Sequence, residues 1–255
     1  MFERWKKFQF LFEELVKRDF KKKYKRTFLG MLWSVISPLL QLLVMSLVFT
    51  QFFGRNVPHF TIYLFSGNLL FSYFSDATTG GMRALLGNAD IFSRVNVPKY
   101  MFLFSRVLQS LINFALTLMV YFIFVAIDGL PFRISFFALL YPIAMMTLFN
   151  IGVGMILSAL FVFFRDIEYL YSVFTMLLMY MSAIFYMVDA YAEHVQRLFL
   201  LNPVYVYIKY FRIIVIDGGF PSLEYHLLSA GYAIILFGLG FLIYRKYNYK
   251  FLYYI

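Results

Sequence analysis

Residues 28–53 read FLGMLWSVISPLLQLLVMSLVFTQFF, a run without one charged side chain. A helix needs about 20 apolar residues to cross the ~30 Å hydrocarbon layer of a bilayer, so this run is long enough for one crossing. Pro38 lies in its interior, where membrane helices tolerate proline because neighbouring groups satisfy the freed carbonyl. We therefore expect residues 28–53 to form a membrane-spanning helix.

The whole chain has the composition of a membrane protein. Of its 255 residues, 62% are hydrophobic and 14% are charged, whereas a soluble domain is about half apolar and about a quarter charged. These values exclude a soluble enzyme, a disordered chain and a coiled coil. Cysteine is absent, which excludes disulfides and thiolate metal sites. The expected fold class is an all-α polytopic membrane protein.

Five further apolar segments follow, separated by polar or charged breaks. We expect spans at about 60–79, 101–127, 135–164, 169–188 and 226–244. The polar loop 80–100 has a helical pattern of its own, so we expect it to dock a partner rather than to be a plain solvated loop. The sequence thus predicts six transmembrane helices, with both chain ends on the same side.

Residues 189–218 differ from these spans because Asn202-Pro203 interrupts them. Each piece is too short to cross the hydrocarbon layer at about 1.5 Å per residue. Proline removes a backbone donor and disfavours helix at the preceding residue, so two half-helices should meet there. We expect an outer re-entrant hairpin packed against protein or a water-filled cavity; the alternative is an interfacial pair beside the last span. A belt at the membrane–water boundary is expected from Tyr205, Tyr207 and Tyr210.

Residues 1–27 have the pattern of a basic amphipathic helix. Trp5, Phe8, Phe12 and Leu15 make one apolar stripe, and most of the lysines fall outside it. Such a helix lies in the headgroup plane, so we expect a cytoplasmic interface helix before a transmembrane domain over residues 28–255. The basic and aromatic tail after residue 245 is expected to be an interfacial anchor.

The distribution of charge predicts the orientation. The chain has 23 Lys and Arg residues and a net charge of +10. If the chain crosses the membrane six times, only five of these Lys and Arg residues lie on the side opposite the termini: Arg55, Arg133, Arg197, Lys209 and Arg212. Because Lys and Arg accumulate on the cytoplasmic side, both termini are expected in the cytoplasm. The charge therefore indicates orientation, and no nucleic-acid partner is expected.

Few ionisable groups lie inside the predicted spans. Asp76 is expected to be hydrogen-bonded near the membrane edge, and Arg106 to extend its charged end to the interface. A membrane-embedded biosynthetic enzyme is disfavoured by this scarcity. No glycine is followed by lysine, which excludes the phosphate-binding G-x-x-x-x-G-K-[ST] loop. If the protein works with ATP, a partner must supply the ATPase.

Four segments resemble, in family order, the bacterial ABC-2 type permeases, closest to the exporters of O-antigen polysaccharide and teichoic acid. They are LVKRDFKKKYKRTFLGMLW at 15–33 with Pro38, YLFSG at 63–67 leading into NADIFSRVNVP at 88–98, FRDI at 164–167 leading into SAIFY at 182–186, and LNP at 201–203 followed by YFR at 210–212. One departure is Ala183, where many members have proline after the serine; this bears on the bend of the fifth span.

The resemblance implies a homodimeric channel that binds two copies of a cytoplasmic ABC ATPase and exports a glycan linked to an undecaprenyl carrier. No cofactor is implied in this chain, since ATP and Mg²⁺ belong to the ATPase. The loop after the second span and the break between spans four and five are implied to contact that partner. The coupling candidates are Asn88, Asp90, Phe92, Arg94, Arg165, Asp166 and Glu168. For the last three, a charge cluster at a helix boundary is the alternative.

The resemblance also bears on the lipid carrier and the pore. Cations of the interface helix either help the carrier's pyrophosphate to reach the pore or only anchor the helix; they are Lys17, Arg18, Lys21, Lys22, Lys25 and Arg26. Most aromatic rings must face lipid or pack between helices, and a minority could line a pore. The channel and gate candidates are Phe49, Phe52, Phe53, Tyr180, Phe185, Tyr186, Asn202, Pro203 and Arg212. We expect Arg212 to be paired or hydrogen-bonded.

The expected function is export of a lipid-linked polysaccharide across the bacterial cytoplasmic membrane, with this chain as the multi-pass permease subunit. The alternative is an ABC-2 permease that exports a drug or a small lipid.

Overall fold

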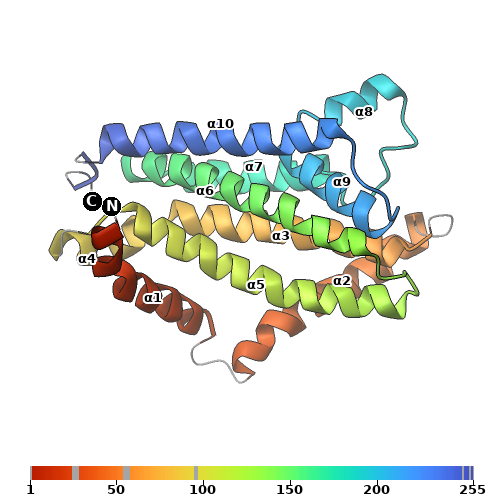
Figure 1. Ribbon diagram of the computed structural model, residues 1–255, viewed down its shortest axis with the longest axis horizontal. Helices are drawn as coiled ribbons and strands as arrows, with labels where there is room; N and C mark the ends of the chain where they lie inside the picture. The colour runs from red at the N-terminus through yellow and green to blue at the C-terminus, as the bar shows by residue number, and fades with distance from the viewer. Residues whose placement is uncertain are drawn as a thin grey trace.

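The computed structural model describes residues 2–24, 29–53, 58–94, 97–248, 250–252 and 254. Within these ranges every regular element is a helix (Figure 1). The α-helices are α1 (Phe2–Tyr24), α2 (Trp33–Phe53), α3 (Phe60–Met82), α4 (Ala89–Arg94), α5 (Tyr100–Ile127), α6 (Leu140–Phe163), α7 (Ile167–Met181), α8 (Glu193–Phe199), α9 (Pro203–Val215) and α10 (Leu223–Tyr247). The 3₁₀ turns are η1 (Gly30–Leu32), η3 (Leu86–Asn88), η4 (Ile134–Leu139) and η5 (Lys250–Leu252).

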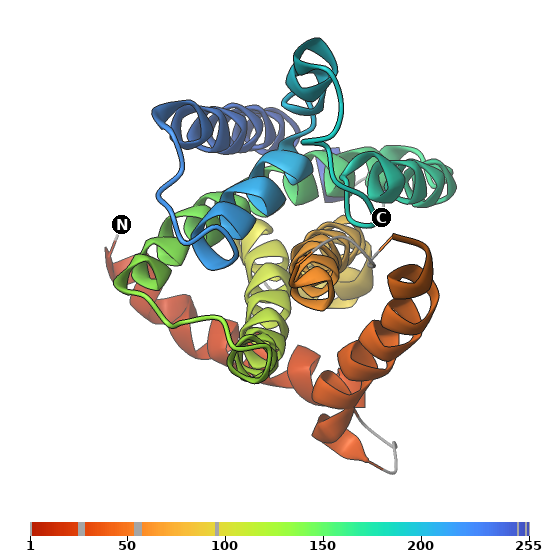
Figure 2. The same cartoon turned by 90° about the vertical axis from the view of Figure 1, so that its right-hand side faces the viewer.

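α3 is the central helix of the bundle. It contacts α2, α5, α6, α7 and α9, and most of its residues are buried. The start of α1 and the end of α10 lie at one end of the bundle, whereas α8 and α9 lie toward the opposite end (Figure 1). Figure 2 shows the bundle end-on, with α2 and α7 flanking α3 on one side. This arrangement places the predicted coupling loop and the predicted hairpin at opposite ends.

Three described helices are long and apolar enough to cross a membrane: α5, η4 with α6 (Ile134–Phe163), and α10. The pair α8 and α9, bent by 109°, makes a fourth if it counts as one span. α3 has sufficient length, with 23 residues, but polar residues that face protein interrupt its apolar sequence. Helices thus occupy all six predicted positions, and the count of six spans stays a prediction.

The predicted span 169–188 is wrong in its second half. α7 has 15 residues and ends at Met181, and residues 182–192 form a non-helical segment, which we call the α7 break. Ala183 lies there in the left-handed region with φ of 51°, which proline, fixed near about −65°, cannot adopt. The alanine that departs from the family pattern is therefore compatible with this backbone. Such a strained segment persists only when its surroundings hold it.

α6 and α10 pack backbone to backbone at Gly152. A Cβ atom built on Gly152 would lie 2.4 Å from the nitrogen of Phe237 and 2.5 Å from the carbonyl carbon of Leu236. Small residues allow helices to approach this closely in membranes, where dispersion contacts drive helix association. This contact holds the last predicted span against the rest of the bundle.

The C-terminal tail is part of the core and is not only an interfacial anchor, which corrects the expectation. Phe251 of η5 has no exposed surface and packs against the rings of Phe163 and Tyr244. Lys99 donates a hydrogen bond to the carbonyl of Asn248, and its Nζ lies 5.6 Å from the ring centre of Phe251. Burial lowers the pKa of Lys99. The tail thereby closes over the start of α5.

The basic N-terminal segment is helical, as predicted, and part of its apolar stripe covers protein. Leu15 is buried, and Phe8 and Phe12 pack against the core, where α1 contacts α5. Phe10 remains 74% exposed. The stripe therefore binds the helix to the bundle, and its location at a membrane surface stays a prediction.

Candidate gate and coupling sites

Arg212 of α9 is buried and hydrogen-bonded through all three of its side-chain nitrogens, which confirms the expectation for this side chain. It donates from Nη1 to the carbonyl of Ala183 at 2.9 Å, from Nη2 to the carbonyls of Tyr63 at 3.0 Å and Ile184 at 3.4 Å, and from Nε to Ser66 Oγ at 3.2 Å. In the described part of the chain no carboxylate forms an ion pair with it. The guanidinium therefore joins α3 and α9 to the α7 break through neutral acceptors.

Two residues of α3 complete this contact. The ring centre of Tyr63 lies 3.4 Å from the guanidinium carbon of Arg212, and its hydroxyl donates to the carbonyl of Tyr186 at 2.7 Å. Gly67 leaves the space that the guanidinium fills, because a Cβ atom there would lie 2.6 Å from Nη2. Stacking of arginine on an aromatic face adds to the hydrogen bonds.

Asn202 holds the turn between α8 and α9. Its Oδ1 accepts from the backbone nitrogen of Val204 at 3.0 Å and so caps α9, in which Pro203 is the first residue. Its Nδ2 donates to the carbonyl of Met181 at 3.1 Å and to Ser182 Oγ at 3.0 Å. The two half-helices predicted to meet at Asn202-Pro203 are confirmed, and the same residue ties them to the end of α7.

The tyrosines of α9 do not form a belt at the surface, contrary to expectation. Tyr205, Tyr207 and Tyr210 are all buried, because α9 packs between α3, α6 and α10. Tyr207 donates to the carbonyl of Ser229 at 2.8 Å, and Tyr210 Oη lies 2.7 Å from His226 Nε2. These contacts favour a hairpin packed into the bundle over a pair that floats beside it.

The aromatic pore candidates separate into two groups. Tyr180 is 56% exposed on α7, while Phe185 is buried in the α7 break with its ring centre 6.1 Å from that of Tyr180. Tyr186 is partly buried and donates to the carbonyl of Tyr180 at 2.9 Å. Three candidates lie at the end of α2 with side chains outside those described: Phe49, Phe52 and Phe53. The break thus brings Phe185 and Tyr186 close to Tyr180, and the carbonyl of Tyr186 accepts from Tyr63 beside Arg212.

The predicted coupling loop contacts the basic helix α1. Arg18 Nη2 donates to Asn88 Oδ1 and to Asp19 Oδ1, each at 2.7 Å, and Asn88 Nδ2 donates to the carbonyl of Ala84 at 2.8 Å. Asp90 is exposed in the first turn of α4. Phe92 and Arg94 belong to α4, with side chains outside those described. The structure therefore joins one of the cationic candidates to one of the coupling candidates.

The break between α6 and α7 contacts the end of α3. Glu168, in the first turn of α7, forms an ion pair with Arg83, the residue that ends α3. Arg165 lies over the ring of Phe161 at 5.6 Å, and Asp166 is the N-cap residue just before α7, without a side-chain cap bond. This charge cluster braces a helix boundary on the same end of the bundle as α4.

The remaining cations of the interface helix are solvent-facing where the structure describes them. Lys17 pairs with Glu14 at 3.0 Å, and Lys21 is exposed. The side chain of Lys22 is not among those described, and Lys25 and Arg26 fall outside the described residues. Exposed Lys and Arg side chains suit electrostatic attraction to anionic headgroups.

The sequence did not predict which residues form the hydrogen bonds with Arg212 and Asn202. Tyr63, Ser66 and Ser182 are the partners concerned, and the positive φ of Ala183 was equally unforeseen. All four lie in the YLFSG and SAIFY segments. The segments were therefore visible in the sequence, while the contacts between them were not.

Comparison with known proteins agrees with this architecture. The family model described as ABC-2 type transporter matches residues 11–216. An O-antigen export system permease protein RfbA of Klebsiella pneumoniae is 30% identical over 248 residues, 95% of each chain. The protein of the same name from Myxococcus xanthus is 27% identical, over 87% of this chain and 86% of the relative. The capsule polysaccharide export inner-membrane protein CtrC of Neisseria meningitidis is 23% identical, over 89% and 87%.

A helical bundle with several membrane-length apolar helices, similar over its whole length to export permeases, defines an integral membrane transporter subunit. The chain belongs to the ABC-2 type transporter family. Its sequence contains no phosphate-binding loop of its own.

Proposed function

We propose that this chain is the permease subunit of an exporter that moves a lipid-linked polysaccharide across the cytoplasmic membrane. The observation that carries the proposal is similarity over 95% of both chains to a permease named for O-antigen export. A capsule export protein matches over 89% of this chain as well. The substrate class proposed is thus a long glycan on a lipid carrier such as undecaprenyl pyrophosphate.

The proposed assembly is a homodimer with two copies of a separate cytoplasmic ABC ATPase, which binds ATP and Mg²⁺. Absence of a Walker loop in the sequence supports a separate energy source. The face of α2 and α7 supports a second copy, because Leu43, Leu47, Val173 and Leu177 on it are all more than half exposed. Exposed apolar area on two helices that flank α3 suits either lipid or an identical partner.

In this proposal the bundle crosses the membrane six times, with α4 and both termini in the cytoplasm. α1 then lies along the cytoplasmic surface, where Lys17 and Lys21 meet the pyrophosphate headgroup. The ATPase contacts α4 and the α6–α7 break, and the Arg18–Asn88 bond links that contact to α1. The α7 break and α9 form the outer gate, which Arg212 stabilises.

The test combines a deletion with a purification. Deleting the gene should abolish the glycan at the cell surface, and a plasmid copy should restore it. The purified chain should hydrolyse no ATP alone, and it should co-purify with the ATPase encoded beside it. A chain lacking Asp90–Phe92 should lose that ATPase, whereas Lys17→Ala, which removes only an exposed pair on α1, should keep it. Unchanged surface glycan in the deletion strain would refute polysaccharide export and favour the alternative, export of a drug or a small lipid.

A further inference from the structure

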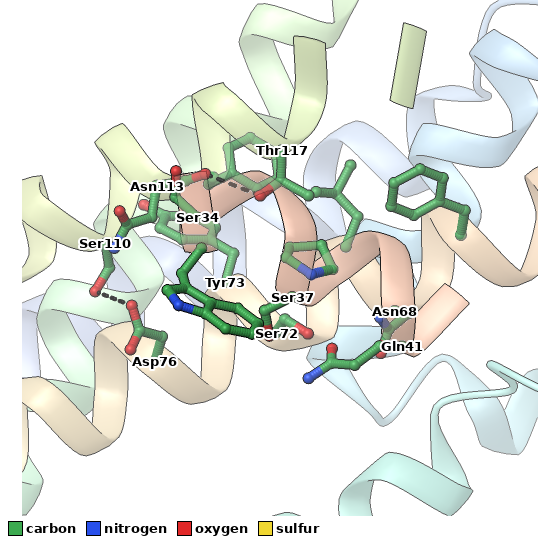
Figure 3. Close-up of a pocket in the computed structure, with 15 residues that line it drawn as sticks. Ser34, Ser37, Gln41, Asn68, Ser72, Tyr73, Asp76, Ser110, Asn113 and Thr117 are labelled. Carbon is green, nitrogen blue, oxygen red and sulfur yellow. Dashed lines mark hydrogen bonds between the residues drawn. The ribbon is translucent and has the colours of Figure 1, made fainter. Parts of the chain in front are cut away.

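A cavity of about 470 Å³ lies between α2, α3 and α5 (Figure 3). Pockets that bury small ligands measure roughly 300–1,000 Å³, so this space has room for one. Figure 3 shows Asp76 and Ser110 on one side of the cavity, Gln41 and Asn68 on the other, and Ser37 and Ser72 between them. Neither the gate nor the coupling contacts described above use these residues.

The part of the polar lining that α3 contributes lies within that helix and away from both of its ends. On α3 it runs from Asn68 to Asp76, which is about 12 Å at 1.5 Å per residue, within a helix of 23 residues. In a protein that crosses a bilayer, polar groups at this depth require partners from protein, water or a ligand. The lining is therefore unlike a surface that faces lipid.

Several of these groups have no partner in the fold. Within the described ranges, Ser37, Gln41, Asn68 and Ser72 form no side-chain hydrogen bond to another residue. Asn68 is only 7% exposed and Ser37 is partly buried, whereas Gln41 and Ser72 are exposed, so the cavity is open on that side. Buried polar groups in folded proteins are nearly always bonded. The cavity therefore presents donors and acceptors to whatever occupies it.

The chemistry of the lining selects among occupants. Hydroxyls and carboxamides predominate, and the one carboxylate, Asp76, accepts from Ser110 Oγ at 3.0 Å. Tyr73 turns its hydroxyl away to Thr147 at 2.9 Å and contributes its ring, 4.8 Å from that of Phe114. Among the described residues no Lys or Arg lines the cavity. A phosphate or an acidic sugar would thus meet a carboxylate and no cation, whereas an uncharged sugar would meet hydrogen-bonding groups and ring faces.

We propose that the cavity between α2, α3 and α5 binds uncharged sugar rings of the exported polymer. This deepens the proposed export function and rests on it. The site belongs to one protomer and lies apart from the groove of about 300 Å³ between α3 and α7, which Ser75 and Thr175 line. The two spaces can therefore be probed separately.

The test is photo-crosslinking in cells that carry the complete exporter and its own polymer. The photoreactive residue p-benzoylphenylalanine replaces Ser37 or Ser72 in the cavity, Thr175 in the other groove, or Ile235, which is 61% exposed on α10. We expect Ser37 and Ser72 to give a ladder of glycan-modified permease that collapses after glycan hydrolysis, and Ile235 to give none.

Other outcomes overturn the proposal. A ladder from Thr175 alone, no ladder from any position in exporting cells, or equal ladders from Ser37 and Ile235 would show that the cavity does not hold the polymer, while export itself would stand. If deletion of the gene leaves the surface glycan unchanged, the proposed function fails and this site fails with it.

Filling the cavity gives an independent readout. Ser72→Trp should reduce surface glycan at least about tenfold, equivalent to about 1.4 kcal/mol of lost interaction. The matched variant Ile235→Trp places the same side chain at an exposed position of α10, and its surface glycan should stay within about twofold of that of the unsubstituted protein. Both variants are compared at equal membrane abundance and with the ATPase still co-purifying, so a folding defect is recognised. Normal export by Ser72→Trp at that abundance contradicts the proposal.

Discussion

The guanidinium carbon of Arg212 lies 3.4 Å from the ring centre of Tyr63, while Arg212 Nη2 donates to the carbonyl of the same tyrosine at 3.0 Å. One buried cation thus stacks on α3 and hydrogen-bonds the α7 break. Because its acceptors are neutral, a substitution leaves no unpaired carboxylate behind. What it leaves are the carbonyls of Ala183 and Ile184 in the α7 break, which helix geometry does not satisfy.

Replacing Arg212 by methionine should destabilise the protein. Ala183 O would keep only the 3.3 Å contact from the hydroxyl of Tyr63, and Ile184 O would lose its donor. Each buried acceptor left without a partner costs about 1–3 kcal/mol. The stability of Arg212→Lys should lie between that of Arg212→Met and that of the unsubstituted protein, because one ammonium cannot reach both α3 and the α7 break. The measurement is thermal unfolding in detergent, with Arg197→Met as control, since that arginine is 75% exposed.

Asn202→Ala should loosen both α9 and the end of α7. The substitution removes the cap of α9 and the bond to the carbonyl of Met181, and loss of a cap alone costs about 1 kcal/mol. Hydrogen exchange should increase in residues 182–192 and in the first turn of α9. Ser222→Ala is the matched control, because Ser222 is the N-cap residue of α10 and makes no side-chain cap bond. Unchanged exchange in the α7 break would contradict the role given to Asn202.

Gly152→Ala should separate α6 from α10. The added methyl would lie 2.4 Å from a backbone atom of Phe237, a contact that rotamer changes cannot relieve, because overpacking a fixed backbone forces it to move. Gly238→Ala, on α10 with nothing within 4 Å, should be neutral or stabilise by about 0.5–1 kcal/mol. The measurement is thermal unfolding of Gly152→Ala and Gly238→Ala in the same detergent. Equal stability would show that the close contact does not hold the pair together.

Phe251→Ala should cost about 3–5 kcal/mol, as expected for removing a fully buried aromatic side chain. Phe251 is 0% exposed, whereas Tyr254, three residues later, is 57% exposed. Tyr254→Ala should therefore change the free energy of unfolding by much less. If both alanine variants lose equally little stability, the tail is an anchor at the surface after all.

The pH dependence of stability should contain a contribution from Lys99. Burial holds its pKa in the folded protein below the usual 10.5, so the unfolded chain binds more protons between those two values. Stability then rises with pH through that window, up to about 10.5. Lys99→Met should remove this rise. The free energy of unfolding is measured against pH for the unsubstituted protein and for Lys99→Met. Subtracting one curve from the other cancels the titration of groups common to both.

Sequence alone determined the helical class, the positions of most apolar segments, the break at Asn202-Pro203 and the absence of a nucleotide loop. These features depend on local properties: the length of an apolar run, the missing donor of proline and the order of residues in a motif. Hydrogen-bonding of Arg212 also followed, because an unpaired cation is too costly in a buried or lipid-facing position.

Only the tertiary structure decided where α7 ends and which groups accept hydrogen bonds from Arg212. It also decided that Phe251 belongs to the core and that polar residues of three helices line one cavity. Each depends on residues distant in the chain; Arg212 and Ser66 are separated by 146 positions. An apolar run by itself predicts a continuous helix. In the folded protein α7 ends early because carbonyls of the α7 break accept from Arg212, a residue that tertiary packing brings close. For the same reason, single Ser and Asn residues in separate spans show no site until packing brings them together.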